Sequence, residues 1–284
     1  MKNTIRISGI LFCLALLSGV CARAQEPKKH SHHKGAMYIS WGYNTEWYTN
    51  STVHVKQDAI GSNYNLLHAK ANDHRGWDKN LLHQQLSIPQ YNWRIGYYFN
   101  DSKDLGVELN FDHTKYIITE DQNIQVKGTL NFAHIDSTIL FNQANGFFYY
   151  LNNGANFLLF NLVKRQPLYH TNDNYLGIDL VCKAGIGPVV PHVQNSFFGH
   201  PNQQHFQLGG WNAGLETALR VTILRYGFLE FSQKVDYARY SGLKIYNGTA
   251  RQSFGTYELI LSAGAIWPTH SNNPMFHNKV KKEE

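Results

Sequence analysis

The stretch LGVELNFDH, residues 105–113, alternates apolar and polar side chains almost without a break. One side of the alternation carries Leu105, Val107, Leu109 and Phe111, and the other carries Gly106, Glu108, Asn110 and Asp112. Because successive side chains of a β-strand point to opposite faces, this pattern predicts a strand with one apolar and one polar face. In a soluble barrel the apolar face packs inside, whereas in a membrane-spanning barrel it meets lipid and the polar face fills the interior. The direction of the apolar face therefore decides the class of protein.

Seven further segments alternate in the same way, the third of them less regularly: residues 37–47, 92–99, 157–165, 176–186, 211–221, 229–237 and 257–267. Along the chain, short connections at 100–104, 166–174 and 224–226 alternate with long ones at 49–90, 120–155, 188–205 and 241–253. We therefore predict an all-β fold, a single up-and-down antiparallel transmembrane β-barrel of eight strands with long loops at one end. Residues 52–56 and 123–128 either extend strands above the membrane or raise the count to ten or twelve.

The first 24 residues have the pattern of a secretory signal peptide. A positively charged start precedes an apolar run at 10–17 and the small-residue cleavage site Ala22-Arg23-Ala24. A lipoprotein signal that uses Cys21 is the alternative, and the bulky Val20 before that cysteine disfavours it. We expect a signal peptide at 1–24, a flexible leader rich in His and Lys at 25–36, the barrel at 37–267 and a periplasmic tail at 268–284.

The formal net charge of +6 overstates the charge of the folded part. Cleavage after Ala24 removes three of the 26 basic residues and leaves 23 against 20 acidic ones. The segment KKHSHHK at 28–34 supplies this remaining excess. The other basic residues form no stripe interleaved with aromatic residues, so we expect no nucleic-acid partner.

The polar faces of the predicted strands carry twelve charged residues: Glu46, Arg94, Glu108, Asp112, Asp179, Lys183, Glu216, Arg220, Glu230, Lys234, Asp236 and Glu258. Solvated exteriors are rich in Lys and Glu, but only 16% of this chain is charged. Glycine recurs between the charges, as a narrow barrel interior requires. The apolar faces carry four tryptophans, Trp41, Trp93, Trp211 and Trp267, which would pack poorly inside one small barrel. We therefore expect the apolar faces outward and the charged faces inward.

Charges inside a barrel must be paired and hydrogen-bonded, because each unpaired charge costs several kcal/mol. We expect Arg94, Lys183, Arg220 and Lys234 to join the inward carboxylates in a network that holds the barrel together. A proton or ion path is the alternative role for this network. Aromatic residues near the short turns predict one interfacial girdle, which consists of Phe99, Tyr169, Tyr175, Tyr226, Phe228 and Trp267.

Signal, alternating strands, connection lengths and aromatic girdle together resemble the small outer-membrane β-barrels of Gram-negative bacteria, of the OmpX and OmpA-barrel type. The stretches GWNAGLETALR at 210–220 and SIPQYNWRIGYYFNDSKDLGVELNFDH at 87–113 are similar to exported barrel proteins of Bacteroidota-type bacteria that have no assigned activity. The resemblance covers most of the exported chain and is architectural. It implies a monomer in the outer membrane, with lipid as its partner and no cofactor, and it does not convey a function.

Some barrels of this size modify lipid A, and two of their residue sets have partial counterparts in this sequence. The deacylase motif His-x-Ser-Asn has its nearest match in Thr269-His270-Ser271-Asn272, which lacks the spacer. A palmitoyltransferase-like rim set of His, Asp and Ser could draw on Asp112, His113, His192 and Ser196. Polar loops supply such sets by chance, so we expect no catalytic residues.

Histidines form two groups that could bind a metal. His30, His32 and His33 lie in the leader, and His54, His68, His74, His83, His192, His200 and His205 lie in the long connections. We expect the first group to belong to a soluble leader. The spacing of the second group matches no known ligand pattern, so we expect exposed polar residues there and no metal site.

These features predict an integral outer-membrane protein whose closed barrel anchors long external loops with a structural or surface-binding role, open to an extracellular ligand. The first alternative is a lipid A-modifying enzyme with an active site on the outer rim. The others are a narrow channel, which would require ten or more strands, and a soluble lipocalin-like carrier, which would require the apolar faces inside.

Overall fold

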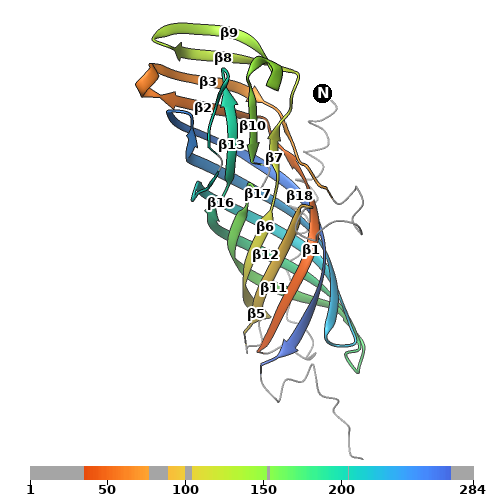
Figure 1. The fold of residues 1–284 in the computed structure, drawn as a ribbon. Helices are drawn as coiled ribbons and strands as arrows, with labels where there is room; N and C mark the ends of the chain where they lie inside the picture. Colours follow the sequence, from red (N-terminus) through yellow and green to blue (C-terminus); the bar gives the residue numbers. More distant parts are fainter. Residues whose placement is uncertain (1–34, 77–88, 100–103, 152–153, 204, 270–284) are drawn as a thin grey trace, which may run out of the picture.

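The computed structural model describes residues 35–76, 89–99, 104–151, 154–203 and 205–269, and most of these residues lie in β-strands (Figure 1). The predicted signal peptide, nearly all of the leader and nearly all of the tail lie outside the described residues. Among the described residues, no helix has the length and apolar character needed to cross a membrane.

Eight long strands pair into a closed ring, each antiparallel to its neighbours and all in chain order. The ring consists of β1 (Ala36–Tyr48), β5 (Tyr91–Tyr98), β6 (Leu105–His113), β11 (Phe157–His170), β12 (Leu176–Val189), β16 (Gly210–Ile223), β17 (Gly227–Ile245) and β18 (Gly248–Pro268). The seam between β1 and β18 closes it, in register from Ala36 with Pro268 to Tyr48 with Thr256. This is an up-and-down barrel, as the alternating connection lengths predict.

Beyond one end of the ring, shorter strands build an extension above the barrel (Figure 1). They are β2 (Ser51–Gln57), β3 (Ser62–Ala69), β4 (Ala71–Asn72), β7 (Tyr116–Ile118), β8 (Gln122–Leu130), β9 (Ala133–Phe141), β10 (Phe148–Leu151), β13 (His192–Phe197), β14 (His200–Pro201) and β15 (His205–Phe206), with 3-10 turns η1 (Asp58–Ile60) and η3 (Gln143–Asn145). Residues 52–56 and 123–128 thus lie in the extension and do not add strands to the ring. The expected long loops are in large part folded β-structure.

The predicted long connection at 241–253 is wrong. β17 and β18 continue through it, and only Tyr246 and Asn247 join them. The pairing register shifts between Tyr240 and Leu243, with Gly242 between them at a φ of 66°. This bulge changes the phase of the apolar alternation, which is why a strict two-residue pattern stops there although the strand continues.

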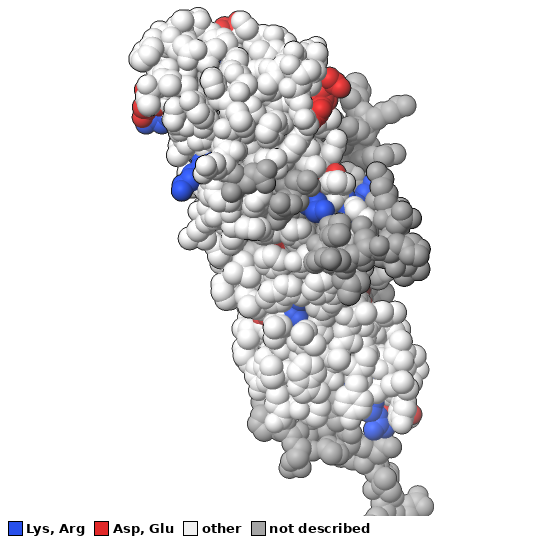
Figure 2. All heavy atoms as spheres, viewed as in Figure 1, with Lys and Arg blue, Asp and Glu red and all other residues white. Residues whose placement is uncertain are grey.

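The outer wall of the ring is apolar. Phe160, Ile186 and Leu261 are 61%, 60% and 62% exposed, although a soluble protein would bury such side chains in its core. In the view of Figure 2, the wall below the extension shows only isolated charged groups. From Tyr226, directly before β17, to Tyr237 within it, eleven residue steps of about 3.3 Å at a tilt of about 40° span roughly 28 Å, close to the ~25 Å apolar band of outer-membrane barrels. The apolar faces therefore point outward.

The outward and inward faces of β17 both change in composition at one level, just beyond Tyr237. Below it, the outward side chains are apolar up to Tyr237 except for Gln233, which bonds the Tyr257 hydroxyl, and the inward ones from Glu230 to Asp236 are charged or polar. Above it, Arg239 is exposed on the outside, while Ala238 and Tyr240 are fully buried on the inside. The membrane boundary therefore falls between Tyr237 and Arg239, because only lipid favours apolar groups on an outer surface.

Two apolar clusters lie at different heights inside the molecule. The larger cluster fills the extension and includes Val55, Tyr116, Phe141, Tyr240 and Phe254. The smaller one lies at the short-turn end of the ring and consists of Ala36, Tyr38, Tyr98, Val163, Val181, Ala218, Phe228 and Ile266. Two inward glycines make room for its rings, since a Cβ at Gly96 would collide with Tyr38 and one at Gly264 with Phe228.

A charge on the outer wall separates the membrane-spanning arrangement from a soluble one. Leu261 lies near the middle of the outward apolar stretch of β18. Leu261→Arg should lower the free energy of unfolding from lipid vesicles by ~2–4 kcal/mol, because the guanidinium would sit in hydrocarbon. The matched control Thr138→Arg, on the exposed face of β9, should leave it within about 0.5 kcal/mol. Equal, small effects of both substitutions in urea titrations would contradict an outward lipid face.

Candidate functional site

The twelve charged residues singled out in the sequence all lie inside the ring, and each is at most 4% exposed. Alternate residues of the ring strands carry them inward, so the interior is an ionic core and not an apolar cavity. Water-excluded charges need partners on every side. The contacts of the core form three layers: a middle layer, a layer below it toward the short turns and a layer above it.

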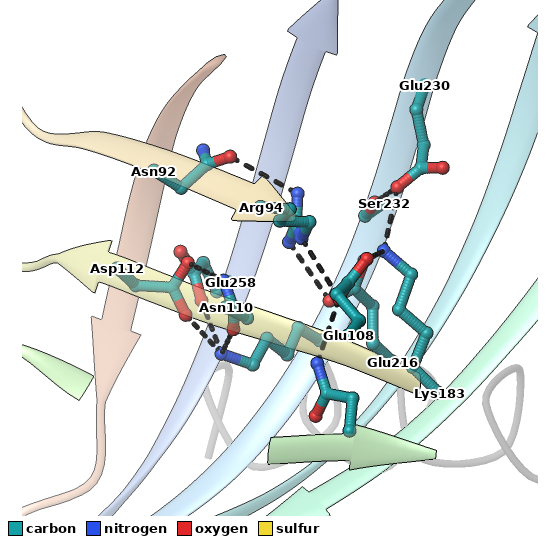
Figure 3. A network of polar contacts seen from close by, with 12 residues as sticks. Asn92, Arg94, Glu108, Asn110, Asp112, Lys183, Glu216, Glu230, Ser232 and Glu258 are labelled. Atoms are coloured by element: carbon teal, nitrogen blue, oxygen red, sulfur yellow. Dashed lines mark hydrogen bonds and ion pairs between the residues drawn. The ribbon is translucent and has the colours of Figure 1, made fainter. Parts of the chain in front are cut away.

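The middle layer contains two basic side chains, Lys183 and Arg94, and three glutamates (Figure 3). Arg220 of the layer below contacts Glu230 and supplies the third positive charge that balances them. The Lys183 ammonium lies 3.1 Å from Glu108 Oε2, 3.1 Å from Glu216 Oε1 and 2.9 Å from Glu230 Oε1. The Arg94 Nη2 donates to Glu216 Oε2 at 3.0 Å, and its Nε lies 3.6 Å from Glu108 Oε1. This layer links five of the eight ring strands through charge-assisted contacts.

The layer below joins the ions to the aromatic cluster at the short-turn end. Arg220 Nε donates to Glu230 Oε2 at 2.6 Å and its Nη1 donates to the Tyr98 hydroxyl at 3.1 Å. The same guanidinium lies 4.5 Å from the ring centre of Tyr38 and 4.2 Å from that of Phe228. Cation–π contacts of this kind gain strength where water is excluded.

The other ionisable groups at this end also have polar partners. Arg165 forms an ion pair with Asp104, and its guanidinium lies 4.8 Å from the Tyr98 ring centre. Asp179 contacts His170 Nε2 at 2.8 Å. Arg165 and Asp104 are members of the core that sequence reasoning missed. The parity of Arg165 with the inward Asn161 was the available signal, but Asp104 belongs to a turn with a positive φ of 52°, where strand parity does not apply.

The upper layer is acidic. Lys234 pairs with Asp112 and lies 3.1 Å from Asp236 Oδ2 and 3.6 Å from Glu258 Oε2. Glu46 lies in the same layer and contacts Tyr48 and Asn44. One base therefore faces four carboxylates, in contrast with the balanced middle layer.

The arrangement seals the ions from water. Tyr38, Tyr98 and Phe228 of the smaller apolar cluster pack against Arg220 at the short-turn end, and Tyr240 and Phe254 of the larger apolar cluster lie above the upper layer. The described contacts of the core thus suit an internal scaffold that holds the ring closed.

The predicted aromatic girdle divides in the structure. Tyr169, Tyr175, Tyr226 and Trp267 are exposed on the outer wall near the short turns, and Phe99 is partly exposed. Phe228 does not belong to the girdle. It shares the inward parity of Glu230, is 3% exposed and packs inside against Arg220.

A second, external girdle was missed. At the upper boundary Trp47 packs against Tyr257 and Trp211 packs against Tyr237, each pair with ring centres 5.7 Å apart. Trp41 stacks on Tyr91 at 4.5 Å nearby. Two aromatic belts, one at each interface, are typical of membrane-spanning barrels.

The four rim residues considered for catalysis do not converge. Asp112 points inward to Lys234, whereas His113 bonds Asn156 at 2.9 Å on the other face of the strand. His192 packs on Phe206 and Ser196 donates to the Gly146 carbonyl at 2.9 Å. Of the deacylase-like stretch, His270, Ser271 and Asn272 lie outside the described residues.

The histidines of the long connections are dispersed. His54 bonds Asn65, His200 stacks on Tyr246 and His205 contacts Gln207. His68 and His74 are exposed, while His30, His32, His33 and His83 lie outside the described residues. In the described part of the chain, no three His, Cys, Asp or Glu residues gather to hold a metal.

Two titratable groups of the extension are perturbed. Burial, together with nearby His205, lowers the pKa of His192, so this imidazole is neutral at pH 7. Burial and a 2.5 Å hydrogen bond to Glu120 raise the pKa of Tyr150 to about 12. Both groups act as neutral packing elements of the extension.

No protein-family model and no curated protein matches the chain. Solved structures similar to it include the Yersinia pestis attachment invasion locus protein Ail in complex with the heparin analogue sucrose octasulfate, at 16% identity, 82% of this chain, 99% of that chain and a TM-score of 0.32. The outer membrane protein OprG of Pseudomonas aeruginosa aligns at 11% identity, 84% and 98% coverage and a TM-score of 0.39. The outer membrane protease OmpT of Escherichia coli aligns at 8% identity, 86% and 99% coverage and a TM-score of 0.37.

These likenesses are distant, and the class of protein follows from the chain's own geometry. A closed antiparallel ring, an apolar outer band between two aromatic belts and a buried ionic interior define the fold of a small outer-membrane β-barrel.

Lys183 offers the sharpest test of the ionic core. Lys183→Met leaves three buried carboxylates short of a cation and should lower the free energy of unfolding by ~3–5 kcal/mol. Adding Glu216→Gln removes one of those carboxylates, so the double variant should recover part of the loss. The control Lys127→Met, which removes an exposed partner of Asp136, should leave the urea midpoint unchanged. A Lys183→Met protein as stable as the wild type would contradict the role of this layer.

Proposed function

We propose that the protein is an integral outer-membrane protein whose closed barrel anchors a folded external part with a binding or adhesive surface. The observation that carries this proposal is the contrast between the two parts of the chain. The barrel interior is packed with buried charged side chains above a small apolar cluster, while the extension has an apolar core of its own. A rigid, filled anchor that supports a large external structure suits display at the cell surface.

Exposed apolar side chains on the extension support a binding role. Phe132, at the tip between β8 and β9, is 81% exposed, and Leu208 is 73% exposed. In the described part of the chain β9 pairs only with β8, so one edge of the extension's sheet is open. Exposed apolar groups and open edges are the usual sites of protein contacts.

A basic outer face just above the lipid band supports contact with outer-membrane lipid. Arg239 and Arg251 are exposed on β17 and β18, beyond the level of Tyr237 and Tyr257. Cations at this height suit the phosphates of lipid headgroups.

The alternatives are less well supported. A channel would require ten or more strands, and the ring has eight. A lipocalin-like carrier needs an apolar cavity, but the ring holds ions. The rim candidates for a lipid A-modifying enzyme bond to separate partners.

Surface labelling tests the proposed location and orientation. Thr138→Cys on β9 should react with a membrane-impermeant thiol reagent on intact Gram-negative cells. Thr171→Cys, in a short turn at the opposite end, should react only after permeabilisation. Labelling of Thr171→Cys but not Thr138→Cys on intact cells would invert the orientation, and labelling of both only after lysis would contradict surface display.

An array experiment tests the binding role. Vesicles carrying the wild-type protein should bind at least one member of an array of glycans and extracellular-matrix proteins, compared with vesicles without it. Phe132→Ser should reduce that binding at least several-fold, because it removes the most exposed apolar side chain of the extension. The control Thr138→Ser should bind like the wild type. Absence of binding to every member would count against an adhesive function.

A further inference from the structure

Two glutamates face each other across the seam that closes the barrel. Glu46 of β1 and Glu258 of β18 are direct register partners, and they are 2% and 0% exposed. Directly opposite residues of an antiparallel pair have Cβ atoms about 4.5–5.5 Å apart, and two like charges at such positions repel. In a water-excluded interior this repulsion is poorly screened.

The pair shares a single amide donor. Asn44 Nδ2 donates to Glu258 Oε1 at 2.5 Å and lies 3.3 Å from Glu46 Oε1. The Tyr48 hydroxyl donates to the other oxygen of Glu46. Neutral donors of this kind stabilise the pair without supplying positive charge.

Positive charge is scarce around the pair. Lys234 approaches Glu258 only to 3.6 Å and lies closer to Asp112 and Asp236. Arg94 and Lys183 belong to the balanced middle layer and contact other carboxylates. The titratable and charged groups that face the pair from the surrounding elements are Tyr48, Asp73, Asp112, Lys234, Asp236 and Tyr240.

One oxygen of Glu258 is poorly solvated by the protein. Glu258 Oε2 is buried and accepts no hydrogen bond from the described residues, and its contact with the Lys234 ammonium is long, at 3.6 Å. A carboxylate oxygen in such a place would lose its hydration without full replacement. A protonated carboxyl avoids that loss, because it carries no full charge and its hydroxyl can turn toward an acceptor.

We infer that Glu46 and Glu258 form a carboxyl dyad that retains at least one proton at neutral pH and thereby keeps the β1–β18 seam closed. Lys234 balances Asp112 most directly, and the dyad relieves the remaining excess of negative charge by staying protonated. Two carboxyl groups that share a site hold a proton more tightly than either would alone.

Infrared spectroscopy of the full-length protein in lipid vesicles at neutral pH tests this inference. The wild type should show the carbonyl stretch of a protonated carboxyl, and Glu46→Gln and Glu258→Gln should each weaken or remove it. Asp58→Asn, which changes an exposed acid paired with Lys56, should leave that band unaltered. The inference is overturned if the wild type lacks the band or if neither glutamine variant alters it.

The dependence of stability on pH gives a second readout that does not require any variant to lose its fold. A proton held by the folded dyad and released on unfolding makes stability fall as pH rises above the ordinary range of glutamate. The urea midpoint of the wild type should therefore decline between about pH 5 and pH 8, and that of Glu46→Gln should decline less. Glutamine imitates a protonated carboxyl, so this variant should fold at neutral pH. Identical pH slopes for the two proteins would contradict a proton on the dyad.

Discussion

The pairing of Lys183 with Glu108, Glu216 and Glu230 is the interaction on which the rest of the structure depends. These groups come from four different strands of the ring, and each lies where neither water nor lipid can solvate it. Breaking one contact would leave a buried charge uncompensated, which costs far more than an exposed ion pair gains. The ring is therefore held closed from inside, and its outer wall is free to be apolar.

Three environments meet along single strands of this protein. Lipid selects the outward side chains up to Tyr237, water selects Arg239 above it, and the interior changes from ions to an apolar core at the same height. The simultaneous change on both faces follows from solvation, since a strand in water must bury its apolar side chains inward and a strand in lipid need not. The extension is thus an ordinary water-soluble β-structure built on the strands of a membrane barrel.

The sequence predicts the barrel well because strand parity is a local property. Leu105 to Asp112 already specifies which side chains share a face, and the scarcity of charge in the whole chain indicates which face is inside. Strand parity alone would have placed Phe228 inward, like Glu230. The prediction put it in the outer girdle because it is aromatic and lies near a short turn. Local pattern failed where the backbone changes phase, at the bulge near Gly242.

The partners within the core could not be predicted from the sequence. Which carboxylate Lys183 reaches depends on the stagger of non-adjacent strands, and Arg94 meets Glu216 across the lumen, 122 residues away in the chain. The extension was also underestimated, because strands such as β2 and β8 alternate in the same way as the ring strands and nothing local separates the two groups. Only the pairing of strands along the whole chain separates the strands of the ring from those of the extension.

The most direct test of an apolar wall and an ionic interior is tryptophan quenching in vesicles. Of six tryptophans in the chain, Trp41, Trp47, Trp93, Trp211 and Trp267 lie on the outer wall or at its belts. Lipids brominated along their acyl chains should quench most of the fluorescence, and iodide in the water should quench little of it. Weak quenching by brominated lipid would place the tryptophans away from hydrocarbon and would contradict the outward apolar face.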